Sequence, residues 1–191
     1  MQIQTVGIIG AGTMGNGIAQ ACATSGINVV MVDISEAAVQ KGLATVAGSL
    51  DRLIKKEKIS ATDKEAALAK IKVSTDYSAL KAAQLVIEAA TENEALKIKI
   101  LQEVDALVAP EVLIASNTPS ISITKLAAVT GRADKFIGMH FFNPVPMMAL
   151  VEVIRGLQTS DATHAAVQAL AQQLGKTPIT VKNGPGFVVN R

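Results

Sequence analysis

Short runs of apolar residues alternate along the chain with longer segments whose apolar positions recur at helical spacing. The short runs are rich in Val, Ile and Leu without strict alternation, which indicates strands buried on both faces, as in a parallel sheet. Because a helical segment follows most of them, the pattern predicts an α/β fold with a doubly wound, mostly parallel sheet of about eight strands. We expect strands at residues 6–9, 28–32, 71–73, 85–88, 112–115, 136–139, 150–154 and 179–181, and helices near 16–25, 36–56, 62–69, 94–108, 122–129 and 161–173.

The segment 34–70 is longer than a simple crossover between two strands requires. It contains two helical patterns, and the cap signals Ser60 and Thr62 precede or open the second one. We therefore expect a helical hairpin over residues 36–70, inserted after the second strand. Such an insertion either adds packing or forms an arm that binds a substrate.

Length and composition fit one ordinary α/β domain with a substantial core, since 49% of the 191 residues are hydrophobic. The net charge of +2, mixed in sign, with only four Phe and one Tyr, disfavours a nucleic-acid partner. No apolar run approaches the roughly 20 residues needed to span a bilayer, and the N-terminus lacks a signal-peptide pattern. These features predict a cytoplasmic protein without a membrane partner.

The single cysteine, Cys22, cannot form an internal disulfide, which fits a reducing compartment. It lies in the apolar row "IAQACA", so we expect a packed helix residue rather than a nucleophile. No metal site is predicted.

Three glycines connect the first predicted strand to the first predicted helix. Gly10, Gly12 and Gly15 form the pattern G-x-G-x-x-G. The first glycine permits a tight turn, the second lets the backbone approach a pyrophosphate, and the third lets the helix pack closely on the strand. Phosphates would bind the unpaired N–H groups at the start of the helix, and Thr13 and Met14, between the second and third glycines, are expected to contact the cofactor.

Asp33 ends the second predicted strand, where a carboxylate can accept hydrogen bonds from both ribose hydroxyls and would repel a 2′-phosphate. No Arg follows it in "DISEAA", which favours NAD over NADP. With the glycine pattern, this residue predicts a Rossmann-type NAD site. The alternative is a glycine turn with a capping aspartate.

Further cofactor contacts are expected where other strands end. "LVIEAATEN" ends near Glu92 and "VLIASNTPS" near Asn117. Lys97, one turn into the following helix, is a candidate for a contact with the nicotinamide ribose or a phosphate. Glu92 could instead be an acid at the helix start, and Lys97 a solvated lysine.

Several motifs, in order, resemble those of the 3-hydroxyacyl-CoA dehydrogenase family, most closely its bacterial 3-hydroxybutyryl-CoA dehydrogenases. Besides the glycine pattern they are "ASNTPS", "GMHFFNPVP", "LVEV" and "NGPGFVVNR", and together they cover the whole chain. The resemblance implies NAD-dependent oxidation of an (S)-3-hydroxyacyl-CoA to the 3-ketoacyl-CoA, or the reverse.

The resemblance also implies roles for particular residues. His140 would take the proton from the 3-hydroxyl, and Glu152 would fix the imidazole. Histidine suits this task because it titrates near neutral pH, and a carboxylate on its second nitrogen sets the tautomer. Asn190 would contact the substrate and steady the histidine, while Asn143 would contact the cofactor or simply form a turn. The alternative is a core histidine bonded to a backbone carbonyl, with Glu152 at the surface.

One position departs from the family pattern. The family reads "SNTSS" where this sequence reads "SNTPS", so Pro119 replaces a serine that binds the substrate oxygen. Proline has neither a hydroxyl nor a backbone N–H, and Ser120 could substitute only if the loop shifts. We expect strongly reduced turnover with cofactor binding retained.

Two cations in the predicted arm, Arg52 and Lys56, share one helical face. In the family this arm receives CoA, whose phosphates suit such a pair. They lie in the charged run "DRLIKKEK", and the usual interpretation of such a run is a solvated face.

The expected domain organisation is an NAD-binding domain over 1–184, followed at 185–191 by the start of a helix. In the family that helix leads into a helical domain that forms a homodimer, so this sequence is expected to be one part of such a protein. A non-catalytic NAD-binding module is an alternative, and a dehydrogenase or crystallin-like relative acting on a non-CoA substrate is another.

Overall fold

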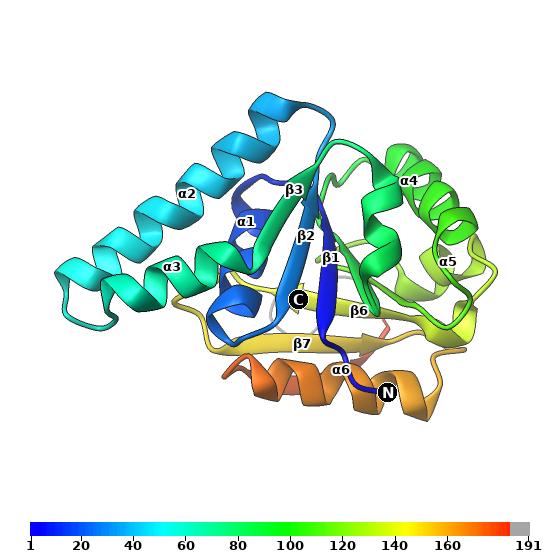
Figure 1. Cartoon of the computed structure of the whole chain (residues 1–191). Helices are drawn as coiled ribbons and strands as arrows, with labels where there is room; N and C mark the ends of the chain where they lie inside the picture. Colours follow the sequence, from blue (N-terminus) through cyan, green and yellow to red (C-terminus); the bar gives the residue numbers. More distant parts are fainter. Residues whose placement is uncertain (184–191) are drawn as a thin grey trace.

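The computed structural model describes residues 1–183, which form one mostly parallel, eight-stranded sheet with helices on both faces (Figure 1). The order of the strands is β3-β2-β1-β4-β5-β6-β7-β8, and only the β6–β7 pair is antiparallel among the described residues. The predicted α/β fold is therefore confirmed. The strands are β1 (Thr5–Ile9), β2 (Asn28–Val32), β3 (Ile71–Ser74), β4 (Leu85–Glu88), β5 (Leu113–Ser116), β6 (Phe136–Phe141), β7 (Leu150–Arg155) and β8 (Thr177–Lys182).

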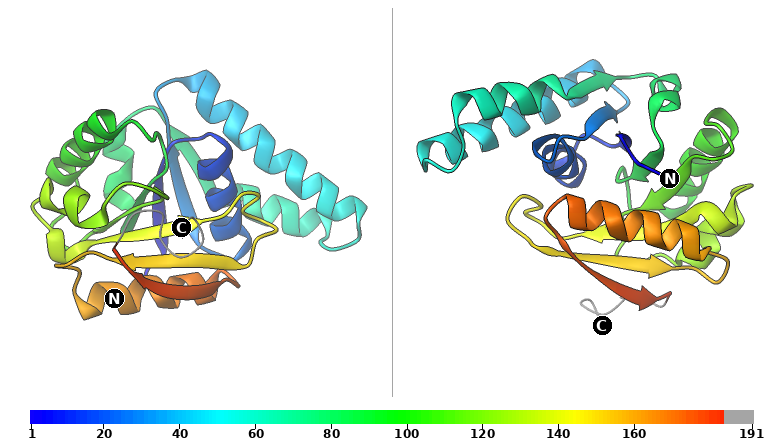
Figure 2. Two further views of the ribbon diagram at one scale, coloured as in Figure 1. Left: turned by 180° about the vertical axis from the view of Figure 1, so that it is seen from behind. Right: turned by 60° about the horizontal axis from the view of Figure 1, so that its bottom comes forward.

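Two apolar cores lie on opposite faces of this sheet. Figure 2 shows the helices that cover these faces. Successive strand residues point to opposite faces, so Met31 joins one core while Val30 and Val32 join the other. One core is covered by α1 (Thr13–Thr24), α2 (Glu36–Lys55), α3 (Ala61–Ala69) and α6 (Asp161–Gln173), and the other by α4 (Glu94–Leu107), α5 (Ile123–Ala128) and η1 (Tyr77–Ala82). Burial on both faces explains the continuous apolar runs in the sequence.

The sheet reverses its direction of growth at β1, which pairs with β2 on one side and β4 on the other. Open α/β sheets bind ligands at the carboxyl ends of the strands beside such a reversal, because the two connecting loops part there. The glycine turn follows β1 and therefore lies at this point. The fold alone therefore predicts a ligand site at the carboxyl ends of these strands.

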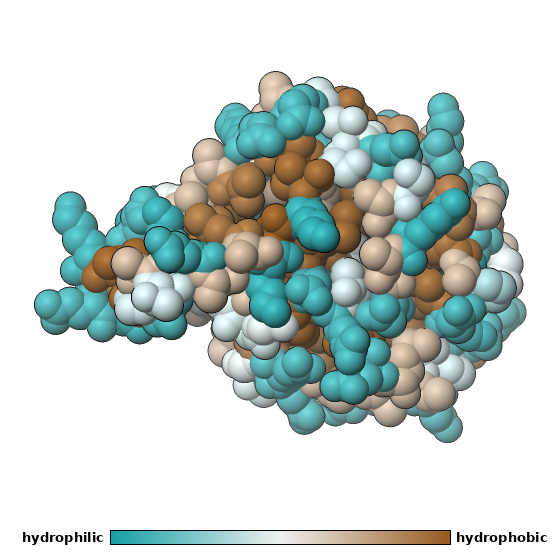
Figure 3. Space-filling view, viewed as in Figure 1, coloured by the Kyte–Doolittle hydropathy of each residue, from teal (hydrophilic) through white to brown (hydrophobic). Residues whose placement is uncertain are grey.

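The insertion after β2 is the predicted helical hairpin, and it projects from the body of the molecule as an arm (Figures 1 and 2). Its second helix begins at Ala61, and Ser60 is the N-cap. The Ser60 side chain accepts from the Asp63 backbone N–H, and the Asp63 side chain accepts from the Ser60 backbone N–H. Thr62 is therefore not the cap. The far end of the arm is largely hydrophilic (Figure 3), whereas Val46 and Leu50 are fully buried against the core.

Some element boundaries differ from the prediction. The strand predicted at 136–139 extends to Phe141, because β7 continues to pair with it beyond the end of β5. Helix α1 begins at Thr13 rather than near residue 16, because it starts directly after the glycine turn. Strand β8 begins before Pro178, which is tolerated because β8 is an edge strand paired with β7 alone. The 3₁₀ helices η1 and η2 (Ala133–Lys135) were not predicted.

Candidate active site

The glycine turn after β1 is shaped by close backbone packing. Gly10 has φ of 105°, and a Cβ on Gly15 would lie only 1.8 Å from the Gly10 carbonyl oxygen. Any larger residue at Gly15 would push α1 away from the turn. A Cβ on Gly12 would meet nothing within 4 Å, so the chain leaves open space in front of the helix start.

The start of α1 offers hydrogen-bond donors to a ligand in that space. Gly12 is the N-cap and provides no side-chain cap, and the first turn contains no acidic residue. The first N–H groups of a helix have no partner within it, and the helix dipole favours an anion there. Met14, partly buried, packs its side chain on the core behind this turn. The geometry suits a phosphate group.

Asp33 lies across a cavity of about 240 Å³ from this helix start. Its Oδ2 accepts from the Ala11 backbone N–H at 2.8 Å, and its Oδ1 accepts from the Ile34 N–H at 2.6 Å. The carboxylate is thereby fixed to the glycine turn itself. Each oxygen retains a second acceptor position, which fits the vicinal hydroxyls of a ribose. The residues present thus fit a dinucleotide.

His140 and Glu152 face each other across the antiparallel pair β6–β7. They are directly opposite in the register, and His140 Nδ1 lies 2.9 Å from Glu152 Oε1. Glu152 is fully buried and His140 is 7% exposed. The Phe142 ring lies beside the imidazole, with centroids 4.4 Å apart. The alternative with Glu152 at the surface is wrong. A hydrogen bond from Nδ1–H to this carboxylate orients the ring and places the lone pair of the neutral imidazole on Nε2.

Parallel pairing brings the end of β6 to the edge of the sheet where β1, β4 and β5 also end. Asn117 follows β5 and is buried, and its Oδ1 accepts from the Phe141 N–H at 2.8 Å. This bond ties the loop after β5 to the strand that carries His140. Asn143 precedes a cis peptide bond to Pro144 and lines a second cavity.

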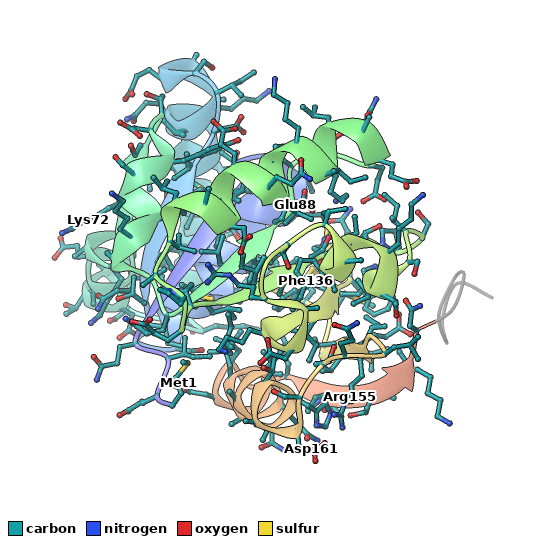
Figure 4. All side chains as sticks on the ribbon, turned by 90° about the vertical axis from the view of Figure 1, so that its right-hand side faces the viewer. Met1, Lys72, Glu88, Phe136, Arg155 and Asp161 are labelled. Carbon is teal, nitrogen blue, oxygen red and sulfur yellow. The ribbon has the colours of Figure 1, made fainter. Side chains whose placement is uncertain are left out.

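Lys97 is not solvated, contrary to one of the two expectations for it. Its side chain is 1% exposed and forms an ion pair with Glu88, which is fully buried at the end of β4. Figure 4 shows the position of Glu88 beside α4. Glu88 also accepts from the Ser116 hydroxyl at 2.9 Å and from the Ala90 N–H at 2.8 Å. The network joins β4, β5 and α4 beneath the edge of the sheet. A cofactor contact for Lys97 remains a prediction.

The loop that contains Pro119 is held by Glu92. The carboxylate of Glu92 lies beyond the end of β4 and accepts from the Thr118 hydroxyl at 2.9 Å and from the Ser120 hydroxyl at 3.3 Å. Glu92 is not the helix cap, since Asn93 caps α4. The Ser120 side chain is therefore engaged with Glu92, and its substrate contact stays a prediction. Asn190 lies outside the described residues, as does the segment 185–191.

A larger cavity of about 630 Å³ lies between α1, the arm and the loop that joins β6 to β7. Arg52 and Lys56 line it, together with Lys58, and none of the described residues that line it is acidic. The arm turns back at Glu57, with φ of 58°, and Lys58 lines the same cavity. The expectation that Arg52 and Lys56 share a face is confirmed.

The sequence interpretation missed several residues of these two cavities. Along α2, Lys41, Thr45 and Ser49 recur at helical spacing with Arg52 and Lys56, so the signal was present in the sequence. Asn16 is buried and lines both cavities, and only the tertiary structure reveals it. Thr13, Asn16 and Thr45 line both cavities, so the two adjoin.

Cys22 is fully buried in α1, and burial raises the pKa of its thiol to about 12. The prediction of a packed helix residue is confirmed, and the raised pKa agrees with the expectation that Cys22 is not a nucleophile. Among the described residues, no helix combines the length and apolar character needed to cross a membrane.

The fold and this pair of cavities define the class of the chain: a Rossmann-type domain with a dinucleotide site. Residues 5–184 match the family model of the 3-hydroxyacyl-CoA dehydrogenase NAD-binding domain. The chain belongs to this family.

Several named relatives are similar along the whole chain. A 3-hydroxybutyryl-CoA dehydrogenase of Bradyrhizobium diazoefficiens is 46% identical over 99% of this chain and 64% of its own length. A probable 3-hydroxybutyryl-CoA dehydrogenase of Bacillus subtilis is 44% identical, over 100% of this chain and 67% of its own. The crystal structure of (S)-3-hydroxybutyryl-CoA dehydrogenase PaaH1 from Ralstonia eutropha is 76% identical with a TM-score of 0.99, covering 100% of this chain and 67% of that one. The chain thus spans about two thirds of these proteins, and slightly less in the first.

Proposed function

We propose that this chain is the catalytic NAD-binding part of a dehydrogenase that interconverts (S)-3-hydroxybutyryl-CoA and acetoacetyl-CoA. The observation that carries the proposal is the buried His140–Glu152 pair, at the edge of the sheet where the glycine turn and Asp33 also lie. The similarity to named 3-hydroxybutyryl-CoA dehydrogenases supports the substrate class.

In the oxidation direction, the 3-hydroxyl loses its proton to Nε2 of His140 as the C3–O bond becomes a carbonyl. NAD, when bound, supplies the oxidised nicotinamide that accepts the hydride from C3. Glu152 keeps the proton of the neutral ring on Nδ1, so that Nε2 holds the lone pair, and its charge favours the imidazolium that forms. The imidazolium then releases one proton to solvent. In the reverse direction the same ring donates the proton.

The larger cavity suits the phosphates of a coenzyme A substrate. Arg52, Lys56 and Lys58 supply positive charge, and the Ser49 hydroxyl adds a polar contact. Asp51 on the same helix is paired with Lys64 at 2.6 Å, so its charge is partly neutralised. An arm that binds substrate therefore explains the long insertion better than added packing does.

Pro119 predicts slow turnover. The proline supplies no donor, and the hydroxyl of Ser120 is bonded to Glu92. Replacing Pro119→Ser should raise kcat on the order of 10²-fold, because removing one donor to a developing oxyanion commonly costs that much. The measurement is NADH consumption with acetoacetyl-CoA, with Pro119→Ala as the control that removes the ring without adding a hydroxyl.

A non-catalytic NAD-binding module is the second candidate, and the loss of the donor at Pro119 is the observation that favours it. Calorimetric titration with NAD, run beside the turnover assay, separates the two. NAD binding without turnover in both the chain itself and Pro119→Ser would replace the first proposal by the second.

A further inference from the structure

Lys176, in the turn between α6 and β8, holds the loop that joins β6 to β7. Its Nζ donates to the carbonyl oxygens of Val145 at 2.6 Å and Met148 at 2.8 Å. The N–H of the next residue, Thr177, donates to the Ala149 carbonyl at 2.7 Å. Three carbonyls of one loop are thus bonded to two adjacent residues that lie far from it in the sequence.

The same loop contacts α1 on its other side. Val145 is 2% exposed, and a Cβ on Gly17 would lie 2.9 Å from the Val145 Cβ, so the loop packs directly on the helix that follows the glycine turn. Residues 143–147 of the loop line the larger cavity. The loop is therefore a wall of that cavity, fixed between α1 and Lys176.

The direction of the Lys176 side chain is set by its backbone. Helix α6 ends in a turn in which Gly175 has φ of 75° and the Lys176 N–H donates to the Ala171 carbonyl at 3.0 Å. The ammonium is half-buried, and burial lowers the pKa of Lys176. A partly desolvated ammonium requires acceptors, and the two loop carbonyls provide them.

We propose that Lys176 is a positioning residue, whose ammonium holds the β6–β7 loop in the shape that binds the acyl-CoA. This inference rests on the proposed function for the identity of the ligand. The effect falls on substrate binding more than on chemistry, because His140 and Glu152 are held by strand pairing rather than by the loop. Lys176 acts through the loop, whose residues 143–147 line the cavity.

The test compares three variants in the whole chain. Lys176→Met keeps the length and apolar stem but removes the donors, Lys176→Arg keeps donors and charge, and Lys182→Met removes an exposed lysine from β8. We expect Lys176→Met to raise KM for acetoacetyl-CoA about tenfold, since small displacements of a binding wall are costly. In Lys176→Met, kcat and the calorimetric affinity for NAD should stay within about threefold of the starting chain. Lys176→Arg should show at most half of this rise in KM, and Lys182→Met should leave KM unchanged.

A second measurement does not depend on activity. The N–H groups of Met147 and Met148 both donate to the Pro144 carbonyl, at 3.0 and 3.1 Å, and hydrogen–deuterium exchange of these amides reports the order of the loop. Faster exchange in Lys176→Met alone supports the proposal that Lys176 holds the loop. Unchanged exchange, or an unchanged KM in an active enzyme, overturns the inference. If the starting chain neither binds nor turns over acyl-CoA while the exchange effect is present, the proposed function has failed, whereas the role of Lys176 in holding the loop stands.

Discussion

Replacing Glu152→Gln removes a charge and leaves the shape of the catalytic pair. Glu152 is fully buried and its Oε1 lies 2.9 Å from His140 Nδ1, so solvent screens the pair weakly. Two unit charges about 4 Å apart interact by about 4 kcal/mol at an effective dielectric constant near 20. The Gln carbonyl can still accept from Nδ1–H, so we expect about 3–4 kcal/mol of the stabilisation of the imidazolium to be lost. Since 1.36 kcal/mol corresponds to tenfold, kcat should fall on the order of 10²–10³-fold.

The assay is steady-state NADH consumption with acetoacetyl-CoA, made in this chain and again in the Pro119→Ser background. KM and NAD affinity should change little, because Glu152 lies behind the imidazole rather than in the larger cavity. Asp105→Asn is the matched control. Its carboxylate accepts from Arg132 Nε at 2.6 Å near the end of α4, and Arg132 also donates to the Val112 carbonyl just before β5 begins. The substitution should therefore lower the melting temperature and spare kcat. If the Glu152→Gln variant is folded and its kcat stays within about twofold of that of its parent, the assigned role is refuted.

Three further predictions concern the arm and the core. Replacing both Arg52 and Lys56 by Gln should raise KM for acyl-CoA and remove much of the salt dependence of that KM, while NAD affinity is kept. The measurement is steady-state kinetics at two ionic strengths. A KM that depends on salt as steeply as before would contradict a phosphate contact. Glu57→Gly should raise the melting temperature by about 2–4 °C, because Glu57 has φ of 58° and glycine adopts that conformation without strain. Glu57→Ala removes the carboxylate but keeps the Cβ, so it should not raise the melting temperature. Because burial raises the pKa of Cys22 from 9.0 to about 12, the unfolded state loses the thiol proton first as pH rises above 9.0. Stability measured by denaturant unfolding should therefore fall more steeply between those values than in Cys22→Ala, by about 1.4 kcal/mol per pH unit, and equal slopes would count against a buried thiol.

The strength of the sequence prediction varies with the distance between interacting residues. The strands, the hairpin and the glycine turn were predicted because each depends on residues close together in the chain. Apolar periodicity, a cap residue and a glycine at a tight turn act within a few residues, so their effect is visible in a short window.

His140 and Glu152 form an intermediate case. Their residue types and the surrounding motifs suggested a pair, but the antiparallel register of β6 and β7 is what brings the two side chains within hydrogen-bonding distance. A shift of one residue in that register would have turned one of them to the other face of the sheet. The role assigned to the pair in catalysis stays a prediction.

By itself the sequence determined the order of elements, the doubly wound sheet and the place of the dinucleotide site. Only the tertiary structure decided that Lys97 is buried on Glu88, that Glu92 holds the hydroxyls of Thr118 and Ser120, and that Lys176 binds the loop beside α1. The physical reason is that a polar side chain takes whichever partner packing brings to it, and the cost of burying it unpaired enforces that choice only after the chain has folded.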